Sequence, residues 1–542
     1  MVRNAAIKIL TPVLLILCPY VYYIEFNRYG FLNVEALLLL VMCLLSGLFL
    51  GTLLLHKNWY LRLFILTITI TVSFSFFSLF KSIVATQIVF FIVLLLNLFL
   101  MDYVLPIIPI VSVAFLFAIF FLPMQHELTA PQYRHTQVSI NQQLPPVIDI
   151  ILDEHVGING IPTNLPGGKK LQKQLIQFYQ ANGFTLYPNA FSHYARTFNS
   201  IPNLLNIYPN AENTAYFPKG IEHLNLTQNQ IFTLLSQAGY AIDVFQPNYI
   251  NFCKAKKAKI ENCYTYPVFS LPYEKRLDIP RKSHLIYLTK SFLHQSSIFE
   301  SMIDVYEFSV RPALAFFHIN VPHLPFTTTQ IAPLAVPDTF NALSKAIIAH
   351  PNGRVFFVHV MMPHYSYIFD QYCHANPDVN AWLENHDLGP KGNMPARRKL
   401  RYGLYENQLR CNYRLLGNFF DKLKQAGIYD KAIIIVNGDH SSRIMQVAPI
   451  QKNADAVTWQ DFEDSYATLY AVKWPGQKGN IDASRASITY LYGKAIEQII
   501  HKPIHLDNGV PYVFLTVENT DKHIVMQSFP LTHFKHAPKV VG

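Results

Sequence analysis

Charged residues are scarce in this 542-residue chain: they make up 14% of it, whereas soluble proteins carry roughly 25%. The shortage is concentrated at the N-terminus, where residues 1–123 hold six Lys or Arg and three acidic residues. The formal charge of +10 is therefore divided into +3 for this segment and +7 for the rest. No run of Lys or Arg and no interleaving of aromatic and basic residues suggests nucleic-acid binding, so we expect no nucleic-acid partner. A mildly basic domain suits work near anionic lipid headgroups, and a generic basic surface explains the charge equally well.

Cysteine is also rare, with six in the chain. No C-x-x-C pair is present, and the adjacent Cys373 and His374 lack ligand spacing, which argues against a cysteine-based zinc site. Two cysteines, Cys18 and Cys43, lie in apolar stretches and are expected to be packing residues. The other four are even in number, which allows two disulfides. The short spacing of Cys253 and Cys263 suits a disulfide that closes a local loop, which leaves Cys373 and Cys411 as the second pair. Such disulfides persist in an exported compartment.

Long apolar runs dominate the first 123 residues. Each run has about 18–22 residues, the length that an α-helix needs to cross a bilayer of roughly 30 Å. A cleaved signal peptide explains the first run poorly, because no small-residue cleavage site follows it. The third and fourth runs are separated only by Lys81 and Ser82, so the number of spans is five or four. The five predicted spans are Ile7–Ile24, Val34–Leu55, Leu61–Phe80, Ile83–Leu100 and Val104–Pro123.

The orientation of this module follows from the basic residues in its short loops. With a cytoplasmic N-terminus, the inner side holds four basic residues and the outer side holds Arg28 and Lys81. Five spans then place everything after Pro123 outside. We therefore predict a multi-pass protein of the plasma or inner membrane whose large domain faces the periplasm or the exterior.

The rest of the chain predicts an α/β domain with a central, mostly parallel sheet. Residues 124–146 are polar and lack periodicity, which is typical of a linker, and residues 147–542 form the predicted catalytic domain. Nearly continuous aliphatic runs indicate buried parallel strands, and helical stretches between them give strand–helix alternation. The predicted strands are Val147–Asp153, Tyr240–Phe245, Arg354–Val360 and Lys431–Val436, and the predicted helices are Lys170–Asn182, Thr227–Ala238 and Leu400–Ala426.

Polar residues gather where these strands end, which is where α/β sheets bind ligands. The first strand ends in Asp153-Glu154, and the last of the four is followed by Asp439-His440. Carboxylate and imidazole groups on tight turns suit a divalent cation such as Zn²⁺ or Mn²⁺. An isolated Asp-His pair at a strand end also serves as a helix cap, so the pairing of two such strand ends carries the metal interpretation.

Thr197 precedes a Ser-Ile-Pro turn that opens a short helix. A hydroxyl at a helix N-terminus benefits from the positive end of the helix dipole. Beside a metal its alkoxide could act as a nucleophile. Taken by itself, Thr197 is better explained as a helix cap, and the neighbouring motifs carry the nucleophile interpretation.

These segments together resemble the alkaline phosphatase superfamily, in particular its membrane-anchored sulfatase-like branch. That branch includes lipid A phosphoethanolamine transferases and lipoteichoic acid synthases, which share an N-terminal helical module and an exported α/β domain. Their T-x-x-S-x-P nucleophile motif is matched by Thr197–Pro202, and their S-D-H-G motif is similar to Gly438–Ser441. The resemblance implies Asp153 or Glu154 as the first acidic metal ligand, Asp439 and His440 as further ligands, and a catalytic His364.

The chain departs from the family pattern in several places. Gly438 and Ser441 replace the usual Ser and Gly around Asp439-His440, and no His lies between His440 and His501. The C/S-x-P-x-R signature of sulfatases that form formylglycine is absent around Thr197, which argues against sulfate ester hydrolysis. A second segment, carrying His318 and His323, resembles the one around His364. We favour His364, because a Tyr-rich run and the long predicted helix follow it.

The resemblance implies a metal-dependent phosphotransferase. Such an enzyme would move a phosphoethanolamine- or phosphoglycerol-like group from a membrane lipid donor to an envelope lipid or glycan through a phosphothreonine. A phosphatase, phosphodiesterase or sulfatase-like hydrolase using the same site is the alternative, and a catalytically inactive binding protein is a further one. The expected cofactor is zinc, with manganese or calcium as alternatives, and the expected state is a monomer.

Overall fold

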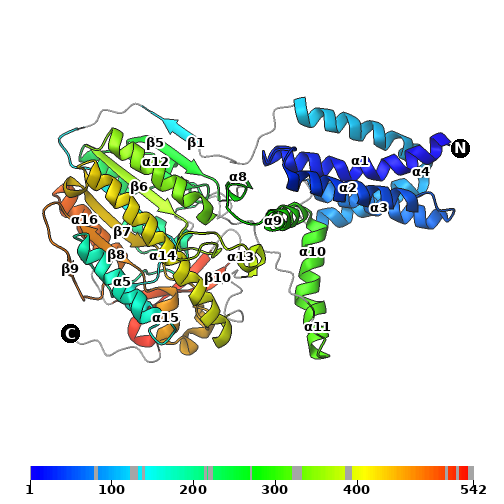
Figure 1. Cartoon of the computed structure of the whole chain (residues 1–542). Coiled ribbons are helices and arrows are strands. Elements are labelled where there is room, and N and C mark those ends of the chain that lie inside the picture. Colours follow the sequence, from blue (N-terminus) through cyan, green and yellow to red (C-terminus); the bar gives the residue numbers. More distant parts are fainter. Residues whose placement is uncertain are drawn as a thin grey trace. The chain divides into compact units, whose positions relative to one another are not determined.

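The structure is a computed structural model of the chain, and its described residues form two compact units. One unit contains Met1–Thr129, Phe269–Thr329 and Asn376–Glu384, and the other contains Ala130–Val268, Gln330–Ala375 and Asn385–Gly542. Figure 1 labels the elements of both. The described residues are 2–77, 83–121, 132–136, 141–212, 216–217, 224–268, 271–319, 321, 332–384, 393–506, 511–519 and 524–534.

The first unit begins with apolar helices, as the sequence predicts. Three of them are long and apolar enough to cross a membrane, and a fourth, α3, is shorter. The four helices are α1 Val2–Phe26, α2 Val34–Leu53, α3 Trp59–Ser75 and α4 Ile83–Phe121. The predicted fourth and fifth spans therefore fall within one continuous 39-residue helix, α4.

Helix α4 nevertheless doubles back on itself. Ser75 is the last residue of α3, and its hydroxyl lies 2.6 Å from that of Ser296. Thr86 lies near the start of α4, and its hydroxyl is 2.8 Å from that of the next residue, Ser297. Phe77 lies just after the end of α3, and its ring is 5.3 Å from that of Phe115, near the end of α4. Both ends of α4 therefore lie near the end of α3. In a straight helix Thr86 and Phe115 would be about 43 Å apart. The two halves of α4 must therefore form a hairpin, equivalent to two spans.

The second half of α4 runs parallel to α1. Thr11 and Cys18 on α1 donate hydrogen bonds to the carbonyl oxygens of Leu105 and Ser112, at 3.4 and 3.7 Å, and Figure 1 shows the cyan part of α4 beside α1. Pro106 lies inside the helix, where a proline removes a hydrogen bond and clashes with the preceding turn. The chain consequently leaves the bundle at the end where α1 finishes, opposite to the N-terminus.

The second unit is built on a nine-stranded sheet of order β1-β5-β4-β6-β2-β7-β8-β3-β9. Its central strands β5, β4, β6, β2 and β7 are parallel, whereas β8 runs antiparallel to β7 and β1 antiparallel to β5. The four predicted strands correspond to β2, β4, β6 and β7. The strands are β1 Gln132–His135, β2 Val147–Leu152, β3 Thr185–Leu186, β4 Ala241–Pro247, β5 Ile260–Tyr266, β6 Arg354–Val360, β7 Ile433–Gly438, β8 Tyr470–Lys473 and β9 Asn480–Ile481.

Helices cover both faces of this sheet. Every residue of β2, β4, β6 and β7 is buried, as the unbroken aliphatic runs predict. One face packs on α6 Thr197–Asn206, α7 Gln230–Gln237 and α16 Ile488–Ile500 through a shared apolar core. In Figure 1 the helices α5 Gly168–Ala181, α12 Val336–Ala349 and α14 Pro395–Gln425 cross the other face. The predicted fold class is confirmed.

Smaller elements complete the two units. In the first unit, α8 Leu271–Glu274, α9 Arg281–His294, α10 Ser297–Val305, η4 Tyr306–Val310, α11 Arg311–Phe316 and α13 Val379–Glu384 join the apolar helices. In the second unit, α15 Trp459–Ser465 precedes β8, and β10 Tyr512–Asn519 pairs with β11 Ile524–Pro530 in a separate two-stranded sheet. The predicted linker contributes β1 to the edge of the main sheet.

Both predicted disulfides are present in the second unit. Cys253 and Cys263 have Cα atoms 6.2 Å apart, and those of Cys373 and Cys411 are 4.9 Å apart. These separations fall within the range that a disulfide spans. Cys18 and Cys43 are free and buried among the apolar helices, as expected.

Candidate metal and nucleophile site

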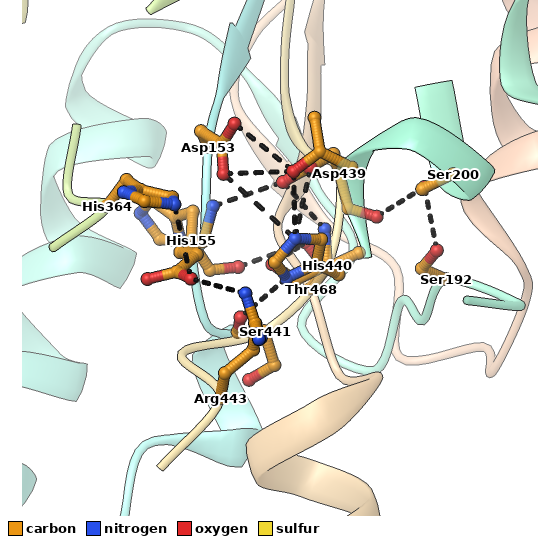
Figure 2. Close-up of polar contacts among 12 residues, drawn as sticks. Asp153, His155, Ser192, Ser200, His364, Asp439, His440, Ser441, Arg443 and Thr468 are labelled. Carbon is orange, nitrogen blue, oxygen red and sulfur yellow. Dashed lines mark hydrogen bonds and ion pairs between the residues drawn. The ribbon is translucent and has the colours of Figure 1, made fainter. Parts of the chain in front are cut away.

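The sheet register brings two polar strand ends together. Leu152, the last residue of β2, pairs with Gly438, the last residue of β7. The next residues along the two parallel strands, Asp153 and Asp439, therefore lie side by side at the carboxyl edge of the sheet. Figure 2 shows their carboxylates facing the ring of His440.

Asp153, Asp439 and His440 form a buried cluster that could hold a cation. One ligand atom from each lies within 4.8 Å of the others. The His440 Nδ1 atom bonds the Ser441 carbonyl oxygen at 2.9 Å, so Nδ1 carries the proton and Nε2 carries a lone pair. That Nε2 lies 3.3 Å from Asp439 Oδ2, a buried oxygen without a hydrogen-bond partner. Converging lone pairs on buried atoms are the arrangement that a bound metal ion satisfies.

Burial disfavours the charged forms of the Asp153 and Asp439 carboxylates. Burial favours the neutral form of Asp153, yet His364, His359 and His440 outweigh that effect and hold its pKa well below the usual range. Burial, followed by repulsion from Asp153, raises the pKa of Asp439. Two carboxylates in one buried pocket resist ionising together unless a cation joins them. The donor set thus fits a divalent metal ion.

Thr197 is the first residue of α6, and its hydroxyl reaches this cluster. Thr197 Oγ1 lies 3.4 Å from each carboxylate oxygen of Asp153 and 3.1 Å from His440 Nε2. Its hydroxyl also acts on the nearby Asp439 carboxylate, whose pKa it lowers against the larger raising effect of burial. The residue is 7% exposed, so a substrate can approach it from one side. A hydroxyl at the positive end of a helix beside acidic ligands is the arrangement of an activated nucleophile.

Comparison with protein families identifies the class of this domain. The family model described as Sulfatase matches residues 153–511, about two thirds of the chain. The chain belongs to the sulfatase family. It is thereby a member of the alkaline phosphatase superfamily, as the sequence motifs predict. No curated protein matches the chain.

Solved structures of the superfamily are similar to the chain at low sequence identity. The C-terminal periplasmic domain of EcEptC from Escherichia coli matches with 11% identity and a TM-score of 0.39, over 72% of this chain and 94% of that one. Phosphonate monoester hydrolase SpPMH from Silicibacter pomeroyi matches with 14% identity and a TM-score of 0.38, over 69% and 79%. The phosphonate monoester hydrolase of Agrobacterium radiobacter matches with 11% identity and a TM-score of 0.36, over 70% and 81%.

Steric crowding explains why this sulfatase-family chain has Gly438 where the family pattern has a serine. A Cβ atom at Gly438 would lie 2.3 Å from Thr468 Oγ1 and 2.9 Å from the His155 carbonyl oxygen. Thr468 donates hydrogen bonds from this hydroxyl to the carbonyl oxygens of His155 and His440, at 3.0 and 3.2 Å. A serine at position 438 would therefore disrupt the contact that ties the two strand ends together.

Ser200 fixes the nucleophile helix against the metal cluster. Its hydroxyl donates a 2.6 Å hydrogen bond to the Asp439 carbonyl oxygen and lies 2.9 Å from the hydroxyl of Ser192 (Figure 2). Ser200 is the serine of the T-x-x-S-x-P motif. The spacing of three residues places it one helical turn from Thr197 and on the same side of α6.

The structure distinguishes the two acidic residues that the sequence left as alternatives. The Asp153 carboxylate faces Asp439 and His440, whereas the Glu154 backbone adopts a left-handed conformation, with φ of 60°. This turns the Glu154 side chain toward His364 Nε2 and Arg443 Nη1, each 3.5 Å from Oε1. The Glu154 backbone N–H still donates to Asp439 Oδ1 at 3.1 Å. Glu154 thus lies beside the cluster, outside the three-residue set.

His364 is buried at the edge of this site. Burial lowers its basicity, but the nearby carboxylates of Glu154 and Asp153 outweigh this and raise its pKa. Its Nδ1 bonds the Tyr365 carbonyl oxygen, which leaves Nε2 directed toward Glu154. A protonated imidazole here can donate to an oxygen of a substrate.

Sequence reasoning missed His359 and Arg443 as site residues. His359 lies on β6, and its Nε2 is 2.9 Å from Asp153 Oδ2; its place one residue before the end of a parallel strand was the available signal. Arg443 follows the Asp439-His440 turn and has a φ of 56°, and no sequence pattern marked it as a site residue. His318 is exposed and belongs to the other unit, and His323 lies outside the described residues.

Proposed function

We propose that this protein is a metal-dependent phosphotransferase. In this proposal it moves a phosphoethanolamine- or phosphoglycerol-like group from a membrane lipid to an envelope lipid or glycan. The observation that carries the proposal is the position of Thr197 Oγ1, which lies within 3.4 Å of the Asp153 carboxylate and His440 Nε2 at the start of α6. A threonine in this place supports phosphoryl chemistry, because sulfate hydrolysis in the family depends on a Cys or Ser that becomes formylglycine.

Asp153, Asp439, His440 and the Thr197 hydroxyl would hold the metal ion. Three oxygen donors and one imidazole nitrogen suit zinc or manganese, whereas calcium prefers sites made of six to eight oxygens. Zinc is therefore our first candidate, with manganese second. Such an ion lowers the pKa of a bound hydroxyl and stabilises negative charge on phosphoryl oxygens.

The side chains of the site then have distinct roles in a double displacement. Thr197 Oγ1 gives its proton to the Asp153 carboxylate, which accepts its hydrogen bonds, and forms a bond to phosphorus. The bond from phosphorus to the donor lipid breaks, and His364 protonates the departing oxygen. An acceptor hydroxyl, deprotonated by His364, attacks the phosphothreonine in the second half and releases Thr197. Water in place of that acceptor would make the protein a phosphatase or phosphodiesterase.

A cavity of about 560 Å³ beside the loop that precedes Thr197 is our candidate for the acceptor, and its lining includes residues of that loop rather than of the metal cluster. Phe191 and His193 contribute to its lining and precede Thr197 in the same loop, and further lining residues include Tyr187, Tyr490, Tyr512, Arg485 and Lys494. Tyrosine rings with a few polar and basic groups suit a sugar, which has apolar C–H faces and hydroxyl edges. Tyr490→Ala should raise the KM for a glycan acceptor and leave labelling of Thr197 by the donor unchanged. If Tyr490→Ala also reduced labelling of Thr197 by the donor, the cavity would not be specific to the acceptor step.

The experiment for the proposed function compares Thr197, the first residue of α6, with Thr458, which stands at the start of α15. Thr197→Ala should abolish transfer of the headgroup of phosphatidylethanolamine or phosphatidylglycerol by the full-length chain in liposomes. Thr458 caps α15 through its side chain, so Thr458→Ala loses a cap, worth about 1 kcal/mol, and should keep most of the activity. Equal losses in the two variants, or full activity in Thr197→Ala, would contradict the proposed role of Thr197.

A further inference from the structure

The segment after α9 is attached to the end of the apolar bundle from which the chain departs. Phe292 on α9 stacks on Phe76 with ring centroids 4.6 Å apart and lies 5.3 Å from the ring of Tyr23. Ser296 and Ser297 then hydrogen-bond to the end of α3 and the start of α4. All of these residues belong to the first unit. The helical run that begins at Ser297 therefore starts at the membrane boundary of the bundle.

This run, α10, η4 and α11, is helical from Ser297 to Phe316. Six large apolar side chains of this run and of the residues just after it are exposed, with exposed fractions from 41% to 79%. They are Met302, Val305, Val310, Phe316, Phe317 and Ile319. Soluble surfaces rarely carry such a contiguous apolar set unless it is a binding surface.

Three apolar residues of α10 share one side of that helix. Ile298, Met302 and Val305 follow the i, i+4, i+7 spacing of one helical face. Glu300 and Asp304 are exposed and fall on the opposite side, since each lies two residues from Met302. Helix α10 is thus amphipathic, whereas the bundle helices are apolar all round.

We propose that the α10–α11 run lies in the lipid–water interface, with Met302, Val305 and Phe316 inserted among the acyl chains. Its start at the membrane boundary and its apolar exposure favour lipid as the occupant. The acids Glu300 and Asp304 make attraction to anionic lipids a poor driving force, so hydrophobic insertion provides the binding. This surface is independent of the chemistry proposed above. It would hold the first unit at a fixed depth on the side to which the chain emerges.

Depth-dependent quenching in liposomes tests this proposal. Full-length chains carrying Met302→Cys, Val305→Cys or Phe316→Cys are labelled with an environment-sensitive fluorophore and reconstituted in phosphatidylcholine that contains an acyl-chain spin label. Glu300→Cys and Asp304→Cys on the same helix are the matched controls. The parent chain gives the labelling background, because Cys18 and Cys43 are buried and the other four cysteines are paired.

We expect at least threefold stronger lipid quenching at the three apolar positions than at the two controls. The difference should persist in 1 M KCl, because insertion rather than charge provides the binding. Weak lipid quenching with ready access for iodide would show that the apolar side faces water. Weak quenching by both agents would show that protein, such as a second copy, covers it. Either of these two results would overturn the proposal.

Discussion

At the scale of single residues, Gly438 shows how tightly the site is packed. Because a Cβ there would lie 2.9 Å from the His155 backbone oxygen, Gly438→Ala should destabilise the domain by about 1–3 kcal/mol and reduce transfer. Gly403→Ala is the control, since nothing lies within 4 Å of its Cβ position and alanine favours a helix interior. Thermal unfolding in detergent measures both. A Gly438→Ala protein as stable as the control would contradict the packing described.

The buried Asp149 on β2 predicts a pH-dependent stability. Burial raises the pKa of Asp149 to about 7, against the lowering effect of the Tyr492 hydroxyl that donates to it. The folded state then binds more protons than the unfolded state between roughly pH 4 and 7, so stability falls as pH rises through this window. Asp149→Asn should remove a fall of at most about 4 kcal/mol and flatten the unfolding profile between pH 5 and 8. A variant with the wild-type pH profile would show that Asp149 does not titrate there.

Sequence patterns located Asp153, Asp439, His440 and Thr197 because each stands at the end of a strand or the start of a helix, where ligands gather. They left Asp153 and Glu154 as alternatives, because the choice depends on the left-handed backbone of Glu154, and strain of this kind has no sequence pattern. His359 was overlooked because it lies inside an apolar strand.

At the scale of elements, the hairpin within α4 can be tested by cross-linking. Phe77→Cys with Phe115→Cys should form a disulfide in the membrane when an oxidant is added, because ring centroids 5.3 Å apart require the two segments to lie side by side. The matched pair combines Phe77→Cys with Phe99→Cys, on an exposed position near the turn, and should stay reduced. Gel mobility without reductant reports the cross-link. No cross-link in either pair would mean that α4 runs straight, because a straight helix carries both Phe99 and Phe115 far from Phe77.

The strands β2, β4, β6 and β7 were predictable because buried parallel strands are continuous aliphatic runs. The long helix α14 was predictable because its polar and apolar residues alternate with helical period. The membership of Phe269–Thr329 in the first unit was not predicted, because nothing local in that segment distinguishes it from a domain helix. Its contacts with the apolar helices, such as those of Ser296 with Ser75 and of Phe292 with Phe76, reveal its position.

At the scale of the whole molecule, the fold of the bundle and the loop charges predict the same topology. The chain leaves the bundle opposite to its N-terminus, so a cytoplasmic N-terminus requires an external sulfatase-family domain. An alkaline phosphatase fused after Pro123 should be active, and a reporter that needs the cytoplasm should be inactive there. Strong activity of the cytoplasmic reporter would contradict this topology and leave the disulfides without an oxidising compartment.

The central claim is that Thr197 forms a covalent bond to phosphorus beside a metal held by Asp153, Asp439 and His440. Mass spectrometry of the full-length chain after incubation with phosphatidylethanolamine or phosphatidylglycerol tests it most directly. The account predicts a phosphodiester adduct on the peptide containing Thr197, with the mass of the donor's headgroup, and its loss after chelation of the metal or in Asp439→Asn. Turnover of donor with an adduct on another residue, or undiminished turnover by Thr197→Ala, would contradict it.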